Sequence, residues 1–214
     1  MPRTDMTRGQ TPAAAEAAVQ ALRAGQLVVL PTDTVYGLCA ESYYEGPYRR
    51  LCRLKRRPQT MPSALLAADL DMILDAVPEA LGRAAVAARA LLPGPYTLVL
   101  PNPARRFRWL TGQSPETIGV RVPELPAESH AVVERVGVLV ATSANLHGGP
   151  DPARVDDVPA EILAGVAAVV DCGELPGTPS TVVDLTGPEP RILREGAVSA
   201  AEALSAGARA LGPR

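Results

Sequence analysis

The sequence predicts an α/β fold: a twisted mixed sheet of parallel and antiparallel strands with flanking helices. Short apolar strands alternate with Ala-rich helical segments early in the chain, whereas the later strands follow one another more closely. The hydrophobic fraction is 47%, with only 3% aromatic residues, and a core of small branched side chains suits this architecture. With 214 residues and no internal repeat, the chain is expected to form one domain with a substantial core.

The N-terminal part of that domain shows clear start and stop signals. Residues 1–10 are expected to be a disordered leader, followed by a domain over 11–200 and a C-terminal helix and tail over 201–214. Thr11 is expected to cap a helix that has Pro12 in its first position and ends before Gly25. An apolar strand is predicted at 27–30, followed by a polar loop at 31–38.

The remaining elements follow from apolar spacing and from the positions of Gly and Pro. We predict a basic helix at 47–54, a strand at 63–67, and helices at 69–75 and 78–92. Strands at 96–100 and 118–122, a helix at 126–136, and a buried strand at 138–142 come next. The last elements are a helix at 155–163, a strand at 167–170, a hairpin of 181–185 with 191–194, and a helix at 199–211.

Bulk properties exclude several classes of protein. The formal net charge is −2, so any affinity for nucleic acid must come from a local patch. Cys39, Cys52 and Cys172 are widely spaced and form no CxxC pair, which favours buried reduced thiols over disulfides or a zinc site. The polar start lacks the apolar region of a signal peptide, and no apolar run could span a bilayer. A cytoplasmic protein without membrane attachment is expected.

The chain has a single lysine, Lys55, among 21 basic residues. Arginine is a planar fork, whereas lysine is a compact point charge suited to a single phosphate oxygen. We therefore interpret Lys55 as a residue that contacts an anion in a site. The alternative is a surface lysine that happens to remain in an arginine-rich sequence.

Polar side chains recur at the ends of the predicted apolar strands, where ligands commonly bind in open α/β sheets. Arg121 interrupts the apolar strand 118–122, and strand alternation places it on the face opposite Ile118 and Val120. It is either a bidentate partner for a carboxylate or phosphate or an ordinary exposed strand residue. The other instances are Thr32, Thr34, Ser143, Asn145, Ser180, Thr181 and Arg194.

Several familiar catalytic patterns are missing. The sequence contains neither GxxxxGK[ST] nor GxGxxG. His130 and His147 lie far apart with no partners at metal-ligand spacing. Ser143 lacks the glycine pattern of a nucleophile elbow. Metal-dependent hydrolysis and a Ser-His-Asp triad therefore have little support.

Seven segments, taken in order, resemble the YrdC/Sua5 family of threonylcarbamoyl-AMP synthases. They cover about residues 11–200, and their order makes the resemblance specific. The segments are PTDTVYGL (31–38), LKRRP (54–58), LPGPYT (92–97), IGVRVP (118–123), TSAN (142–145), PSTVVD (179–184) and ILREG (192–196).

The resemblance implies a YrdC-like sheet with a concave, basic cavity, and the synthesis of L-threonylcarbamoyl-AMP and pyrophosphate from L-threonine, bicarbonate and ATP. A separate transferase complex would then modify adenosine 37 of tRNA. For threonine binding it implies Thr34, Arg121, Ser143 and Ser180. For ATP binding it implies Lys55, Arg57, Thr117, Asn145 and Arg194, with Lys55 and Arg57 as the catalytic cations. Mg²⁺ is expected on the ATP phosphates, because the sequence shows no dedicated carboxylate cage.

Three positions depart from the family pattern. Met61 stands where Lys, His or Asn is usual, Leu66 where a threonine-binding His often occurs, and His147 where the family has Ser. A divergent relative that uses another amine or carbamoyl substrate is therefore an open alternative.

A second alternative is an RNA-binding module without catalysis, in contact with tRNA or double-stranded RNA. Basic residues cluster at 49–57, and Arg105, Arg106 and Arg108 flank Phe107 and Trp109. Basic side chains interleaved with aromatic rings can bind RNA, although such runs are more often solvated surfaces.

Overall fold

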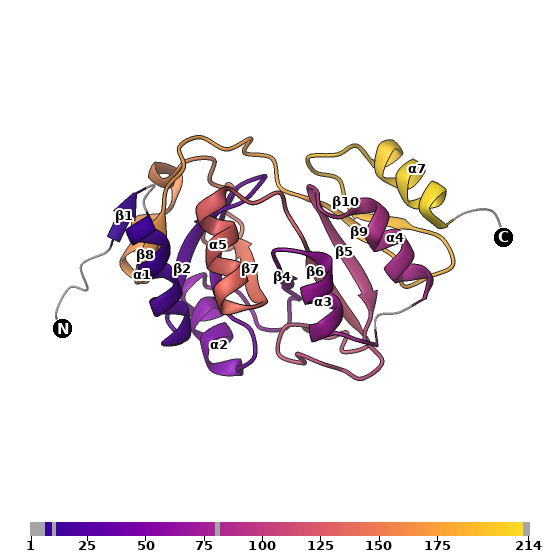
Figure 1. Ribbon diagram of the computed structural model, residues 1–214, viewed down its shortest axis with the longest axis horizontal. Coiled ribbons are helices and arrows are strands. Elements are labelled where there is room, and N and C mark those ends of the chain that lie inside the picture. Colours follow the sequence, from indigo (N-terminus) through magenta and orange to yellow (C-terminus); the bar gives the residue numbers. More distant parts are fainter. Residues whose placement is uncertain (1–6, 10–11, 80–81, 212–214) are drawn as a thin grey trace.

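In the computed structural model, which describes residues 7–9, 12–79 and 82–211, the strands form a ten-stranded sheet ordered β1-β8-β2-β3-β7-β4-β6-β5-β9-β10 (Figure 1). The strands are β1 (Thr7–Gly9), β2 (Val28–Pro31), β3 (Tyr36–Glu41), β4 (Ala64–Leu66), β5 (Tyr96–Pro101), β6 (Thr117–Arg121), β7 (Leu139–Ser143), β8 (Ala168–Val170), β9 (Thr181–Asp184) and β10 (Arg191–Arg194). The α-helices are α1 (Pro12–Arg23), α2 (Glu45–Leu54), α3 (Leu70–Ala76), α4 (Arg83–Leu91), α5 (Ala127–Val136), α6 (Ala160–Ala164) and α7 (Ala200–Leu211).

The sheet is mixed, which confirms the predicted fold class. The pairs β1–β8, β2–β8, β4–β6 and β5–β9 are parallel. The pairs β2–β3, β3–β7, β4–β7, β5–β6 and β9–β10 are antiparallel. The last of these is the predicted hairpin.

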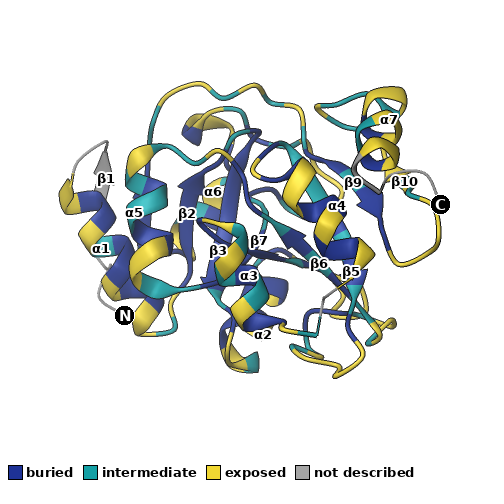
Figure 2. Cartoon of the chain, turned by 45° about the vertical axis from the view of Figure 1, so that its right-hand side comes forward, coloured by how far each residue is buried: buried dark blue, intermediate teal, exposed yellow. Residues whose placement is uncertain are grey.

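The helices cover the two faces of the sheet unequally. The larger apolar cluster contains side chains from α2, α3, α4, α6 and α7 together with one face of the strands. The smaller cluster contains side chains from α1 and α5 and the opposite face, but only around β2, β3, β7 and β8 and the end of β4. The strands are largely buried, whereas the helices expose their outer sides (Figure 2). The α1/α5 face is therefore left without a covering helix over β5, β6 and β9.

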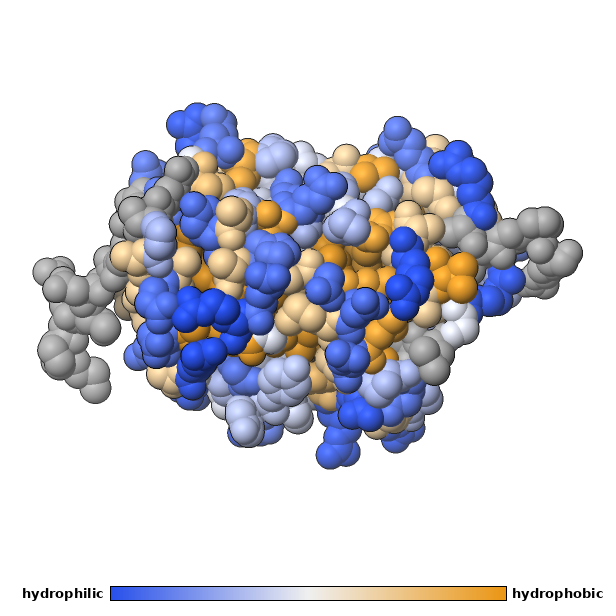
Figure 3. Space-filling view, in the orientation of Figure 1, coloured by the Kyte–Doolittle hydropathy of each residue, from blue (hydrophilic) through white to orange (hydrophobic). Residues whose placement is uncertain are grey.

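The outer surface of the molecule is of an ordinary kind. Polar side chains are spread over the face shown in Figure 3 and alternate with small apolar areas, as expected when each helix packs one side against a sheet. No helix in the described part of the chain has the length and apolarity needed to cross a bilayer.

Two predicted elements near the N-terminus are corrected. The loop expected at 31–38 is confined to the residues between β2 and β3, because Tyr36–Glu41 pairs with β2 as a strand. The Thr32 hydroxyl closes this turn by donating to the Val35 carbonyl at 2.8 Å. Within the expected leader, Thr7–Gly9 forms β1 beside β8; the rest of the leader and the Thr11 cap lie outside the described residues.

Two predicted helices are shorter than expected. The helix expected at 78–92 begins only at Arg83, after Gly82, whose φ of 77° lies in the left-handed region that glycine tolerates. The helix expected at 155–163 is a 3₁₀ turn, Val155–Asp157, followed by α6. Pro159 separates the two because it lacks an N–H and cannot continue a helical ladder.

Gly196 allows the chain that follows β10 to pack closely against the backbone of Pro179 and Ser180. A Cβ at this position would lie 2.1 Å from the Pro179 carbonyl oxygen, and the Ala197 N–H donates to that same oxygen at 2.8 Å. We predict that Gly196→Ala lowers the free energy of unfolding by about 1–3 kcal/mol, measured by denaturant unfolding. Gly187→Ala is the control, because its nearest contact would be 3.7 Å. Equal stability of the two variants would contradict this packing.

Candidate active site

A cavity of about 430 Å³ lies over the part of the sheet that α1 and α5 leave uncovered. Small residues on the strands, Ala64, Gly119 and Ala141, line it, and this lack of bulk leaves room for a ligand. Other lining residues are Val35, Arg57, Pro62, Ser63, Thr97, Val99, Ser114, Thr117, Arg121, Thr142, Ser143, Asp151, Pro179, Ser180, Val182, Leu193 and Arg194. Its volume is within the usual range for small-molecule sites.

Arg121 lies at the end of β6, on the same face as Thr117 and Gly119, as the alternation predicts. One guanidinium nitrogen donates to Asp33 Oδ1 at 2.9 Å and to Thr34 Oγ1 at 3.1 Å. The Arg121 and Asp33 side chains are only 12% and 10% exposed. Burial raises the pKa of the Asp33 carboxyl, although the adjacent guanidinium opposes this rise. The pair holds Arg121 rigidly at the cavity wall.

Lys55 is placed by the way α2 ends. Arg56 adopts the left-handed region with a φ of 54°. The Arg56 N–H donates to the Arg53 carbonyl, and the Arg57 N–H donates to the Cys52 carbonyl at 2.8 Å. This is a Schellman motif with arginine at the position usually taken by glycine. As a result, Lys55 and Arg57 point toward the cavity side, while Arg56 turns outward to pair with Glu161.

Lys55 is buried, with 3% of the residue exposed. Its ammonium lies behind the cavity wall. It donates to the Ser143 carbonyl at 2.6 Å, to the Asn145 carbonyl at 2.8 Å and to Asn145 Oδ1. The Ser143 hydroxyl donates to the same Oδ1 at 2.7 Å. Burial first, and then the charge of Arg57, lower the pKa of Lys55 to about 8. Lys55 thus holds the loop that follows β7 in place.

The opposite wall is built from β5, β9 and β10. Ser180 Oγ lies 2.8 Å from Thr97 Oγ1, and Arg194 donates to the Ser180 carbonyl at 2.8 Å. Thr117 Oγ1 donates to the Ser114 carbonyl at 3.2 Å. These contacts join three strands that are separated in sequence.

Unpartnered polar atoms gather at the cavity. In the described part of the chain, the buried side-chain atoms without a hydrogen-bond partner are Asp33 Oδ2, Arg57 Nε and Arg121 Nε. Buried donors without partners are costly. Two guanidinium N–H groups at a cavity wall are suited to an anionic ligand.

The nine residues expected to form the site lie together in the structure. Arg57, Thr117, Arg121, Ser143, Ser180 and Arg194 line the cavity. Thr34, Lys55 and Asn145 stand directly behind it, each hydrogen-bonded to a lining residue.

Sequence reasoning missed five further polar residues that line the cavity: Ser63, Thr97, Ser114, Thr142 and Asp151. Thr97 and Thr142 belong to the segments that carry the family resemblance, so their position was a usable signal. Thr142 accepts a hydrogen bond from Arg57 at 3.3 Å. Asp151 lies outside the quoted segments, and only the structure places it at the cavity.

Thr97 orients the Ser180 hydroxyl. If Ser180 binds threonine as the resemblance implies, Thr97→Val, which keeps the side-chain shape but removes the hydroxyl, is predicted to weaken threonine binding about fivefold, since a neutral hydrogen bond contributes about 1 kcal/mol. Thr97→Ser should retain affinity. Titration calorimetry with L-threonine measures both variants, and equal affinities would remove Thr97 from this role.

The comparisons with known proteins agree on one family. The Sua5/YciO/YrdC family model, described as telomere recombination, matches residues 20–196. The chain belongs to the Sua5/YciO/YrdC family. It is 36% identical over 183 residues to a putative threonylcarbamoyl-AMP synthase of Mycobacterium tuberculosis, covering 85% of this chain and 83% of the relative. It is 35% identical over 181 residues to the Pyrococcus abyssi threonylcarbamoyl-AMP synthase, covering 82% of this chain and 52% of that one.

Solved structures of the family share this fold. P. abyssi Sua5 complexed with L-threonine matches with a TM-score of 0.84 and 30% identity, over 94% of this chain and 60% of that one. Escherichia coli YciO matches with a TM-score of 0.80 and 26% identity, over 95% of this chain and 100% of that one. The family recognised from the sequence is thereby confirmed.

None of the three positions that depart from the family pattern is among the lining residues of the cavity. Leu66 is buried opposite Arg121 in the β4–β6 pairing. Met61 is 37% exposed. The His147 N–H donates to the Lys55 carbonyl at 2.9 Å. The backbone of His147 therefore joins the loop that follows β7 to the end of α2.

Proposed function

We propose that this chain is an L-threonylcarbamoyladenylate synthase that joins L-threonine, bicarbonate and ATP and releases pyrophosphate. The observation that carries the proposal is the convergence of all nine expected residues on one cavity. Family membership supports it, because relatives 35–36% identical bear the name of this activity.

Threonine would bind at the Arg121 side of the cavity. The unpartnered Arg121 Nε provides a donor for the substrate carboxylate, and Ser143 and Ser180 add hydroxyl groups. Thr34 and Asp33 fix the guanidinium from behind. L-Threonine is bound in the P. abyssi Sua5 structure, which supports this choice of substrate.

ATP would bind along Arg57, Thr117 and Arg194, with Lys55 and Asn145 supporting the wall. Mg²⁺ would enter as part of the nucleotide substrate and offset phosphate charge. The described residues contain no group of three or more His, Cys, Asp or Glu side chains arranged for a metal. This donor set suits a cation carried on phosphates rather than in a protein cage.

The chemistry requires positioning and charge stabilisation. The threonine amine condenses with bicarbonate to a carbamate with loss of one water molecule, and a carbamate oxygen then attacks the α-phosphorus as pyrophosphate leaves. Holding the amino acid and nucleotide in one cavity makes these steps effectively intramolecular. The guanidinium groups of Arg57 and Arg194 stabilise charge that develops on the phosphates. No covalent enzyme intermediate is needed.

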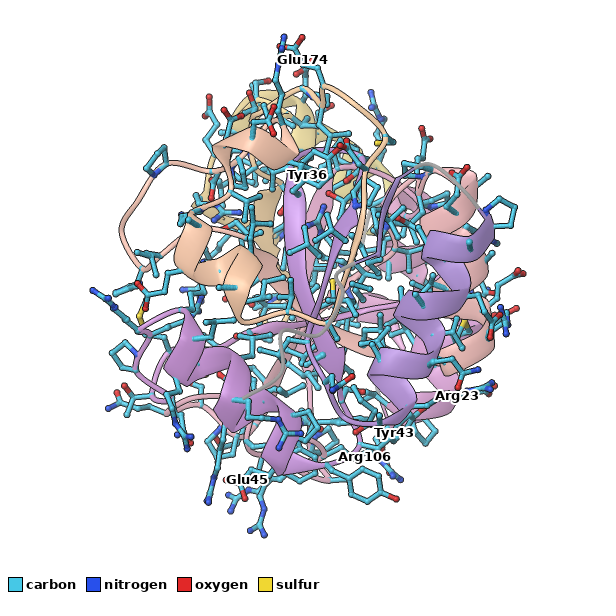
Figure 4. The ribbon with its side chains drawn as sticks, turned by 90° about the vertical axis from the view of Figure 1, so that its left-hand side faces the viewer. Arg23, Tyr36, Tyr43, Glu45, Arg106 and Glu174 are labelled. Carbon is cyan, nitrogen blue, oxygen red and sulfur yellow. The ribbon has the colours of Figure 1, made fainter. Side chains whose placement is uncertain are left out.

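The product would pass to a separate transferase complex that modifies adenosine 37 of tRNA in the cytoplasm. Direct tRNA contact by the two basic segments has less support than their composition suggests. Arg49, Arg56, Arg105 and Arg106 each pair with a glutamate. Tyr43 and Arg106 lie near the end of the molecule opposite Tyr36, which directly follows the cavity residue Val35 (Figure 4). Arg57 of the other basic segment lines the cavity itself. The glutamate partners of the four arginines therefore carry the preference for the synthase over the RNA-binding module.

Pyrophosphate release tests the proposal. The purified protein is incubated with ATP, bicarbonate and Mg²⁺, with and without L-threonine, and chromatography detects the adenylate. Threonine-dependent release with formation of the adenylate is expected. ATP binding without release would indicate a divergent relative with another amine substrate. Absence of both ATP binding and release would overturn the synthase.

A further inference from the structure

Asp151 is the only carboxylate among the residues that line the cavity, whose cationic members are Arg57, Arg121 and Arg194. The backbone around it is anchored on both sides. The Asn145 side-chain amide donates to the Gly149 carbonyl at 2.5 Å, and the Tyr36 N–H donates to the Pro152 carbonyl at 2.9 Å. The half-buried Asp151 side chain itself makes no hydrogen bond or ion pair within the described ranges.

The position of Asp151 within the cavity is set by its neighbours. Its negative charge raises the pKa of Lys55, against the effects of burial and of Arg57. The Asn145 side chain, which accepts hydrogen bonds from Lys55 and from the Ser143 hydroxyl, donates to the Gly149 carbonyl two residues before Asp151. Asp151 therefore follows directly on the loop that Lys55 holds in place.

A free carboxylate at the cavity would repel ATP phosphates unless a cation lay between them. Mg²⁺ prefers oxygen ligands, and proteins usually hold it through one or two carboxylates together with substrate phosphates and water. Asp151 supplies one such oxygen donor at a wall where the proposed function places phosphates. The alternative cation, the threonine ammonium, belongs with the threonine carboxylate near Arg121.

We propose that Asp151 is the protein ligand, directly or through one water molecule, of the Mg²⁺ that accompanies ATP. This inference rests on the proposed function, because it requires ATP in the same cavity. Asp151 then makes the site bind magnesium-bound ATP more tightly than free ATP.

Nucleotide binding without turnover tests the inference. We would measure the affinity of α,β-methylene-ATP by calorimetry without threonine, in Mg²⁺ and in EDTA, for the wild-type protein, Asp151→Asn and Asp75→Asn. The last variant removes an exposed carboxylate on α3 and controls for net charge. The gain in affinity on adding Mg²⁺ should fall at least about tenfold in Asp151→Asn. Affinity in EDTA should be unchanged or tighter, because a repulsive charge is lost.

The possible outcomes are distinct. An unchanged magnesium-dependent gain in Asp151→Asn overturns the inference while leaving the synthase intact. A separate calorimetric titration with L-threonine covers the alternative: loss of threonine affinity in Asp151→Asn with the magnesium dependence intact also overturns the inference and assigns the carboxylate to the substrate ammonium. If the wild-type protein binds no nucleotide, both the inference and the proposed function fall. An unchanged melting temperature shows that Asp151→Asn is folded.

Discussion

Arg121→Ala should abolish measurable threonine binding and lower the free energy of unfolding by about 3–5 kcal/mol. The substitution removes the partner of Asp33, whose carboxylate is only 10% exposed and has a second oxygen without a hydrogen bond. A buried charge left without its partner costs this much. Threonine affinity is lost separately, since the guanidinium is the proposed partner of the substrate carboxylate. Calorimetry with L-threonine and denaturant unfolding measure the two effects.

Two further variants separate binding from stability. In the double variant Arg121→Ala/Asp33→Asn, the unpaired Asp33 carboxylate is also removed. Most of the stability should therefore return, while threonine binding stays lost. Arg105→Ala is the matched control, because Arg105 pairs with Glu116 at 2.8 Å but both side chains are 59% exposed. A surface pair of this kind contributes at most about 1 kcal/mol. Equal threonine affinities in Arg121→Ala and Arg105→Ala would contradict the carboxylate role.

Local patterns predicted the elements whose signals are strong. The alternation of Ile118, Val120 and Arg121 placed the arginine on the correct face of the sheet, because side-chain direction in a strand follows directly from spacing. The hairpin of β9 and β10 was marked by its Gly-Pro turn. The breaks near Gly82 and Pro159 show the limit of apolar spacing, since helical periodicity continued across residues that interrupt the backbone.

Other features depend on contacts that the sequence does not display. The strand Tyr36–Glu41 was hidden because the polar loop expected at 31–38 includes its first three residues, and because its pairing with β7 spans about a hundred residues. The turn at Arg56 could not be predicted from the sequence. Glycine usually marks the left-handed backbone position that ends a helix, and here an arginine occupies it. The nine site residues are scattered from Thr34 to Arg194 and could be assembled only through the family resemblance, because single hydroxyls after strands are usually turn formers.

Lys55→Ala should reduce turnover about 100-fold or more, which is typical for the loss of one charge-stabilising donor. The single lysine of the chain holds the Ser143 and Asn145 carbonyls together, and the substitution removes both the positive charge and this support. Lys55→Arg should restore little, because a planar fork cannot replace a compact ammonium among these acceptors. Arg53→Ala, an exposed position on the same helix, is the control. Pyrophosphate release at wild-type rates in Lys55→Ala would exclude Lys55 from the site.

The pH dependence of stability gives an independent test of how Lys55 is buried. Its pKa is about 8 in the folded protein, against 10.5 for an ordinary lysine. Below pH 8 both folded and unfolded states carry the proton, and the cost of the buried charge is fully present. Between about pH 8 and 10.5 the folded state releases the proton first, so the unfolded state binds more protons and stability rises with pH. Relative to Lys55→Met, the wild-type protein should gain up to about 3 kcal/mol over this interval. A constant difference between the two proteins, followed by denaturant unfolding from pH 7 to 10.5, would contradict the lowered pKa of Lys55 and would mean that its hydrogen bonds to Ser143 and Asn145 offset the burial of the ammonium.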